Sequence, residues 1–119
     1  MAENKTHQIG DVTVVELSGR LHLGNSLTYA ENAISRLIEG GTRKLVIDLT
    51  QLDYMDSSGL GMLIFSGGRM QESGGRLRVA GAKGTVARVF QIAHADQVLQ
   101  FDVDLETACR NLAAEAAAG

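Results

Sequence analysis

Apolar and polar positions along the chain group into segments that predict strands and helices in turn. Residues 8–9 and 12–17 flank Gly10-Asp11, which predicts an opening hairpin. Residues 44–49 are almost all apolar, as in a strand that is buried on both faces. Between and after these strands, apolar residues recur every three to four positions, which is the spacing of a helix with one buried face.

Helix-start residues and glycine pairs divide the rest of the chain. We expect helices from near Asn25 or Ser26, over about 60–72, over about 83–94, and from near Asp102 or Asp104, with further strands at 77–80 and 98–101. The predicted order is ββαβαβαβα. Because single helices separate most strands, neighbouring strands should be parallel, with right-handed crossovers. The sequence therefore predicts an α/β fold whose mixed, mostly parallel sheet carries an N-terminal hairpin at its edge.

The composition is that of an ordinary globular protein. With 119 residues and 45% hydrophobic positions, we expect one domain (1–119) with a core at about 8–113 and flexible ends at 1–5 and 114–119. The net charge of −3 gives no broad basic surface for nucleic acid. Cys109 is the only cysteine, so neither an internal disulfide nor a metal pattern is expected. No apolar run suits membrane insertion or a signal peptide, and we expect a cytoplasmic protein.

A polar turn between the strand at 44–49 and the following helix holds the candidate chemistry. Asp53, Asp56, Ser57 and Ser58 lie close together in it. Free backbone N–H groups at a helix start favour an oxygen anion. Since the side chains here are acidic, we interpret the turn as holding a serine hydroxyl rather than cradling a bound phosphate.

Other interpretations of this turn exist. One serine could simply cap the helix, with the acids suiting its positive end. Gly59 and Gly61 remove side chains beside Ser57, which would leave room for another protein to approach the hydroxyl. A catalytic serine would need a base, for which His22 and His94 are the candidates, but neither a hydrolase elbow nor a phosphate-binding loop is present.

The helix after the turn offers a candidate partner surface. If its core face contains Leu60, Leu63, Ile64 and Gly67, then other large side chains point away from the core. The predicted partner-binding residues are Met62, Phe65 and Arg69. The alternative is that Met62 and Phe65 pack beneath neighbouring elements.

The run Asp56-Ser57-Ser58-Gly59-Leu60-Gly61, preceded by the strand at 46–49 and followed by the segment 75–79, resembles the STAS domain family, over about residues 9–112. More narrowly, it is similar to bacterial anti-sigma factor antagonists. The resemblance implies that Ser57 is phosphorylated by an anti-sigma factor that is a serine kinase. The unphosphorylated protein would bind this kinase and free a sigma factor, and a PP2C-type phosphatase would reverse the modification. It also implies no enzymatic activity and no cofactor for this chain itself.

One position departs from that family pattern. His22 stands where related antagonists commonly carry an aspartate close to the phosphorylation site. His22 could instead hydrogen-bond Ser57 or a phosphate. The departure favours a second interpretation, a STAS subunit that does not switch by phosphorylation, in a lipid-transport ABC complex or a signalling scaffold.

Overall fold

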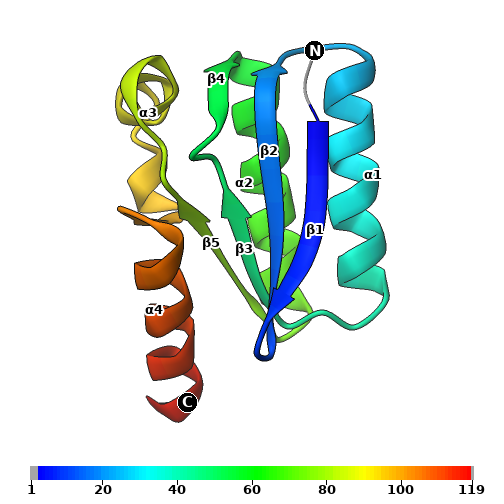
Figure 1. Ribbon diagram of the computed structural model, residues 1–119, viewed down its shortest axis with the longest axis vertical. Helices are drawn as coiled ribbons and strands as arrows, with labels where there is room; N and C mark the ends of the chain where they lie inside the picture. The colour runs from blue at the N-terminus through cyan, green and yellow to red at the C-terminus, as the bar shows by residue number, and fades with distance from the viewer. Residues whose placement is uncertain (1–2, 119) are drawn as a thin grey trace.

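The computed structural model describes residues 3–118, with side chains through residue 115. The predicted α/β fold is confirmed, with helices packed on both faces of one mixed sheet (Figure 1). The elements in chain order are β1 (Glu3–Ile9), β2 (Val12–Leu21), α1 (Asn25–Glu39), β3 (Lys44–Asp48), β4 (Leu52–Met55), α2 (Ser57–Glu72), β5 (Arg76–Ala80), α3 (Gly84–Ile92), a short 3-10 helix η1 (Ala95–Gln97), β6 (Gln100–Asp102) and α4 (Leu105–Ala118).

The sheet order is β1-β2-β3-β5-β6, with β4 paired to β2 off this path. The predicted hairpin is confirmed: β1 and β2 are antiparallel, and Gly10 at their turn has a φ of 61°. The remaining strand pairs are parallel. The carboxyl ends of the parallel strands therefore meet at one edge of the sheet, where the loops leading into α1, α2 and α3 lie (Figure 1).

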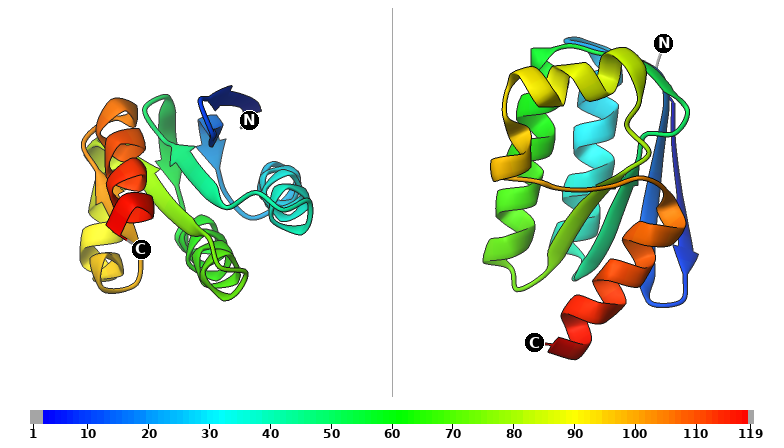
Figure 2. Two further views of the ribbon diagram at one scale, coloured as in Figure 1. Left: turned by 90° about the horizontal axis from the view of Figure 1, so that it is seen from below. Right: turned by 90° about the vertical axis from the view of Figure 1, so that its left-hand side faces the viewer.

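Two apolar cores lie between the sheet and the helices, one on each face of the sheet. The larger core contains residues of α1, α2 and α3 against one face of the sheet, including Ile34, Leu63 and Phe90. The smaller core joins Ala108 and Leu112 of α4 to the opposite face. Figure 2 shows α4 on the side of the sheet away from α1 and α2. The sheet is thus a central layer that fixes where each helix begins.

The sequence did not predict β4. Asp48 ends β3 in a tight turn, because its Oδ1 accepts from the backbone N–H of Thr50, at 3.0 Å, and from the Thr50 hydroxyl, at 2.6 Å. β2 is long enough to pair with β3 along its first half and with β4 along its end, with a register shift between Gly19 and Arg20. β4 therefore delivers the chain to the start of α2 beside the end of β2.

The amino-terminal boundary also differs from the expectation. Glu3 to Lys5 belong to β1 and pair with β2 as far as Ser18, so the first strand begins before the expected core boundary at about residue 8. Residues 1 and 2 lie outside the described part. At the other end, α4 continues to Ala118, so the backbone of residues 114–118 is helical where we expected a flexible end.

Candidate functional site

Asp56 organises the turn at the start of α2. Its Oδ1 accepts hydrogen bonds from the backbone N–H groups of Ser58 and Gly59, each at 3.0 Å. Its Oδ2 accepts from the backbone N–H of Leu23, in the loop before α1, also at 3.0 Å. The aspartate, rather than a serine, is therefore the helix cap. The same carboxylate joins the start of α2 to the β2–α1 loop.

Ser57 is the first residue of α2 and is exposed. Because the cap is Asp56, the Ser57 side chain is not required for capping. Gly61 and Phe65 follow at intervals of four residues, which places all three on one face of the helix. Gly61 is exposed, and a Cβ added there would meet nothing within 4 Å. The site is thus a serine at the open end of a solvent-facing helix surface.

Gly59 has a different role from the predicted one. It is buried, and a Cβ added there would lie 2.6 Å from Met55 Cγ and 3.2 Å from Leu21 Cδ2. Gly59 therefore lets the first turn of α2 pack closely on β2 and β4, and it does not open space for a partner. Only Gly61 leaves the room beside the serine that we expected from both glycines.

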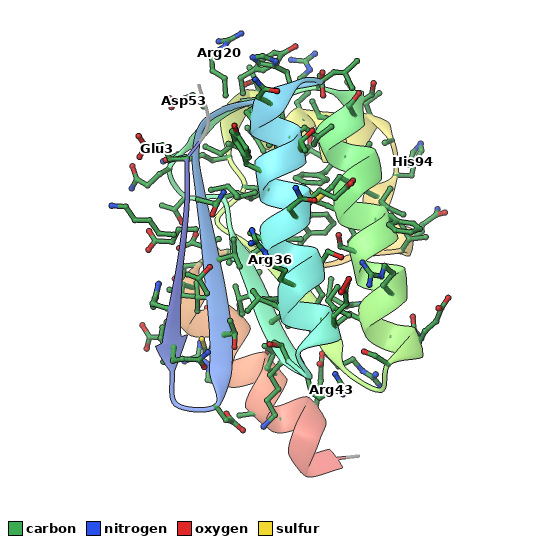
Figure 3. The ribbon with its side chains drawn as sticks, turned by 90° about the vertical axis from the view of Figure 1, so that its right-hand side faces the viewer. Glu3, Arg20, Arg36, Arg43, Asp53 and His94 are labelled. Atoms are coloured by element: carbon green, nitrogen blue, oxygen red, sulfur yellow. The ribbon has the colours of Figure 1, made fainter. Side chains whose placement is uncertain are left out.

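The acidic surround of Ser57 is unevenly distributed. Partial burial would raise the pKa of Asp56, but the three backbone N–H groups of Leu23, Gly59 and Ser58 outweigh it and lower that pKa, with a smaller contribution from the charge of His22. Asp53 lies on β4, exposed, and its backbone carbonyl accepts from the hydroxyl of Thr85 at 3.3 Å. Figure 3 shows Asp53 at the end of the molecule where α1 and α2 begin, opposite Arg43. The ionised carboxylate beside Ser57 is that of Asp56.

His22 is an exposed loop residue beside this carboxylate. Its Nδ1 lies 3.2 Å from the carbonyl oxygen of Leu23, and its own carbonyl accepts from the Ser26 hydroxyl at 3.2 Å. Among the described residues, no hydrogen bond joins His22 to Ser57. His22 therefore does not hold the serine, and a Ser57–His22 catalytic pair has no geometric support.

The predicted partner surface on α2 separates into three different environments. Met62 is 4% exposed and belongs to the larger core, so its assignment to an outward face is wrong. Phe65 is 64% exposed, as expected of an outward residue. Arg69 donates from Nη1 to the hydroxyl of Ser35 at 2.7 Å, and its Nη2 lies 3.8 Å from Glu39, so it joins α2 to α1. Only Phe65 presents a free apolar side chain on this face.

The family profile of the STAS domain matches residues 4–108. The chain belongs to the STAS domain family. It is 27% identical over 78 residues to an anti-sigma-B factor antagonist of Staphylococcus aureus, covering 66% of this chain and 71% of the relative. Its fold matches an anti-sigma factor antagonist from Mycobacterium paratuberculosis, with a TM-score of 0.87, 20% identity and 94% of each chain covered. It also matches the Bacillus cell fate determinant SpoIIAA in its phosphorylated form, with a TM-score of 0.71, 21% identity, and 91% and 98% of the two chains covered.

One exposed residue at this site of the STAS domain, Leu23, carries no periodic signal in the sequence. Leu23 is 73% exposed and gives its backbone N–H to Asp56. It lies in a loop outside any periodic segment, so no sequence pattern marked it. Its neighbour Gly24 has a φ of 131°, in the region that favours glycine. The only available signal was an apolar side chain in a loop that leads to the same sheet edge as Ser57. Exposed apolar side chains thus occur in the loop that contacts the Asp56 cap, at Leu23, and on the same face of α2 as Ser57, at Phe65.

The described residues of the STAS domain offer no other ligand set at this turn. Within residues 3–115, no three histidine, cysteine or acidic side chains are grouped so that they could hold a metal ion. In the same part of the chain, no helix is both long enough and apolar enough to span a bilayer. This turn therefore provides the solvent-facing hydroxyl of Ser57 next to the ionised carboxylate of Asp56, which already accepts three backbone N–H groups.

Proposed function

We propose that this STAS domain is an anti-sigma factor antagonist that binds an anti-sigma factor serine kinase, releases a sigma factor, and is switched off when Ser57 is phosphorylated. The single observation that carries the proposal is the exposed Ser57 at the open start of α2, directly after the capping Asp56. The Staphylococcus aureus relative, named an anti-sigma-B factor antagonist, supports the same function. The chain acts as a binding module and a kinase substrate, and the nucleotide belongs to its partner.

The surroundings of Ser57 explain why a phosphate would act as a switch. Phosphorylation adds about −1.5 to −2 charges and three acceptor oxygens. The N–H groups of Ser58 and Gly59 in α2 and that of Leu23 are already bound to Asp56, whose carboxylate is ionised at neutral pH. The added phosphate therefore meets an existing negative charge and few free donors in its own chain. It would stay solvated on the surface, so a change of fold is not needed.

The partner would contact the apolar side chains that this surface exposes. Phe65 lies two helical turns from Ser57, about 12 Å along α2. Leu23 lies on the other side of the capping carboxylate. A phosphate on Ser57 would have to lose water when a partner covers this surface, and that cost opposes docking. A coupling of about 1–3 kcal/mol, or about 5- to 150-fold in affinity, is typical of such switches.

Phosphorylation of the purified chain tests the modified residue. The protein is incubated with its cognate anti-sigma factor kinase and ATP, and the modified residue is mapped by mass spectrometry. We expect one phosphate on Ser57, none on the Ser57→Ala variant, and unchanged modification of Ser58→Ala. Ser58 is the matched control because it is the adjacent hydroxyl, but it is partly buried. Modification at Ser58 or elsewhere, with Ser57 unmodified, would refute the assignment.

Partner binding tests the consequence of the modification. Wild type, Ser57→Ala and Ser57→Asp are compared in a pull-down or by calorimetry against the same kinase. We expect Ser57→Ala to bind as wild type does and Ser57→Asp to bind at least about fivefold more weakly. Treatment of the phosphorylated protein with a PP2C-type phosphatase should restore binding. Equal binding by the alanine and aspartate variants would contradict the switch.

His22 supports a second candidate function, a STAS subunit of a lipid-transport ABC complex or a signalling scaffold that is not regulated by phosphorylation. The observation is that an exposed histidine, rather than an aspartate, adjoins the capping carboxylate. The His22→Asp variant separates the two functions. If the chain is a kinase substrate, this variant is modified at least as fast as wild type. If neither wild type nor His22→Asp is modified, and Ser57→Asp binds its partner as wild type does, the subunit function is favoured.

A further inference from the structure

A cavity of about 480 Å³ lies beneath α3, away from Ser57. It opens at the carboxyl ends of β5 and β6, and α3 and η1 form its outer wall. In Figure 2, α3 and η1 stand beside the strand ends rather than flat on the sheet. Clefts at the carboxyl ends of parallel strands are common ligand sites in α/β proteins. The volume also falls within the range of about 300–1,000 Å³ that is usual for small-molecule pockets.

Aromatic rings and small side chains shape the inner part of this cavity. The rings of Phe90 and Phe101 lie with centroids 4.7 Å apart, tilted by 59°. Phe90 is 4% exposed and belongs to the larger core, so its ring is fixed by packing. Ala82 and Ala87 line the cavity beside them, and their small size leaves the space open. Because Phe90 is buried and the two rings are tilted, a flat ring of one or two fused cycles fits such walls by apolar contact with Phe101 and the alanines.

The polar side chains of the rim select the charge of the occupant. The described lining residues include two aspartates and neither lysine nor arginine. The carboxylate of Asp102 is already held by the guanidinium of Arg78 at 2.6 and 3.1 Å and by the side-chain amide of Asn111. Asp96 on η1 is exposed and supplies the remaining negative charge. A cationic group is therefore favoured at the rim, and a phosphate or carboxylate is opposed.

His94 shapes the rim through its backbone. It follows the last turn of α3 with a φ of 54° and a ψ of 39°, and it is the only residue other than glycine with a positive φ among those described. This left-handed residue ends α3 and reverses the chain into η1. The reversal brings His94 and Asp96 to the lining of the same cavity.

The geometry points to a small-molecule site between α3, η1 and the ends of β5 and β6 that binds a compact aromatic amine. The ring of the ligand packs against Phe101 and the two alanines, and its ammonium group faces Asp96. This site is separate from Ser57, so its binding activity stands or falls independently of the phosphorylation switch.

The test uses tryptamine as the probe and indole-3-acetate as its matched anionic control, with the full chain labelled for heteronuclear NMR. We expect saturable tryptamine binding, with a dissociation constant of about 1 mM or tighter. The shifted amides should cluster at Ala82, Ala87, Phe90 and His94. Indole-3-acetate, which carries the same ring with the opposite charge, should bind at least about fivefold more weakly.

Three variants assign the binding to the proposed contacts. Ala87→Leu fills the cavity and should weaken tryptamine binding at least about fivefold. Asp96→Asn should weaken it about two- to fivefold and reduce the preference over indole-3-acetate. Glu72→Gln removes an exposed carboxylate of α2 that does not line the cavity, and it should change neither. Because Asp96 and Glu72 are exposed, both variants should keep the folded spectrum, so the charge test does not depend on Ala87→Leu.

Three results would overturn the proposal. The first is the absence of saturable shifts at the cavity amides with tryptamine. The second is that wild type binds tryptamine and indole-3-acetate equally well and that Asp96→Asn leaves both affinities unchanged. The third is unchanged tryptamine binding by a folded Ala87→Leu variant.

Discussion

Replacing Asp56 tests the construction of the candidate site most directly. Its carboxylate accepts three backbone N–H groups, two at the start of α2 and one from Leu23 in the preceding loop. Asp56→Ala removes all three acceptor contacts at once. Asp56→Asn keeps one acceptor oxygen but removes the charge. The pair of variants therefore separates the hydrogen bonds from the charge at the same position.

The expected magnitudes follow from these contacts. Loss of a helix cap costs about 1 kcal/mol, and the lost bond to Leu23 adds a smaller amount, so we expect Asp56→Ala to lower the free energy of unfolding by about 1–2 kcal/mol. For a chain of 119 residues this lowers Tm by about 4–8 °C. Asp56→Asn should cost about 0.3–1 kcal/mol, which is the usual effect of a charge at a helix terminus.

The cost of Asp56→Asn should depend on pH in a defined direction. The pKa of Asp56 is lower in the folded protein than its unfolded value of about 3.9, so the folded state binds the proton less readily. The stabilisation by the charge is therefore fully present above the unfolded pKa and is lost as the pH falls through the lower, folded-state pKa. The difference between wild type and Asp56→Asn should be constant from about pH 6 to 8 and shrink progressively below about pH 5.

Urea unfolding of wild type, Asp56→Ala, Asp56→Asn and Asp53→Asn, measured from pH 3 to 8, checks this prediction. Asp53 is the control because it is an exposed carboxylate on the adjoining strand, and its replacement should change the free energy of unfolding by no more than about 0.5 kcal/mol. An Asp56→Ala protein as stable as wild type would show that the cap contributes nothing. An Asp56→Asn cost that is the same at pH 3 and pH 7 would refute the role of the charge.

Four further predictions concern the packing of α2, its exposed face and a buried ion pair. Gly59→Ala should destabilise the fold by about 1–3 kcal/mol because the new Cβ would lie 2.6 Å from a Met55 side-chain carbon, and unchanged urea unfolding would contradict the close approach. Met62→Ala should cost about 2–5 kcal/mol of stability. Phe65→Ala should leave stability within about 0.5 kcal/mol but weaken kinase binding by more than about 1 kcal/mol, and the reverse pattern in calorimetry would show that the two faces are misassigned. Arg78→Ala should cost about 3–5 kcal/mol in thermal unfolding because it leaves Asp102, whose side chain is 2% exposed, without its ion-pair partner, and a loss below about 1 kcal/mol would argue against that burial.

Local signals in the sequence were sufficient for the turn that holds Ser57. The aspartate, two serines and a glycine at the start of an apolar run are residues whose preferences act over one helical turn. The polar turn and its acidic residues were therefore predictable without knowledge of the fold, although we expected the helix from about residue 60 and it begins at Ser57. Which residue served as the cap was not predictable, because both Asp56 and the serines are good capping residues.

The orientation of α2 could not be predicted in the same way. Five of the six residues from Leu60 to Phe65 are apolar, so a period of 3.6 residues fits more than one buried face. The structure buries Met62, Ser66 and Met70 as well as Leu60 and Leu63, because α2 packs against α1 and the sheet together. Phe65 is left outside by that packing, and its hydrophobicity alone gave no sign of the choice.

The sequence by itself determined the succession of strands and helices apart from β4 and η1, the N-terminal hairpin and the position of the polar turn, since each depends on neighbours within a few residues. Tertiary structure decided the pairing of β4 with the end of β2, the burial of Met62 and Gly59, and the meeting of Leu23 with Asp56 across 33 residues. These outcomes depend on how whole elements pack, because a side chain is buried by residues that are distant in the chain and carry no local signal.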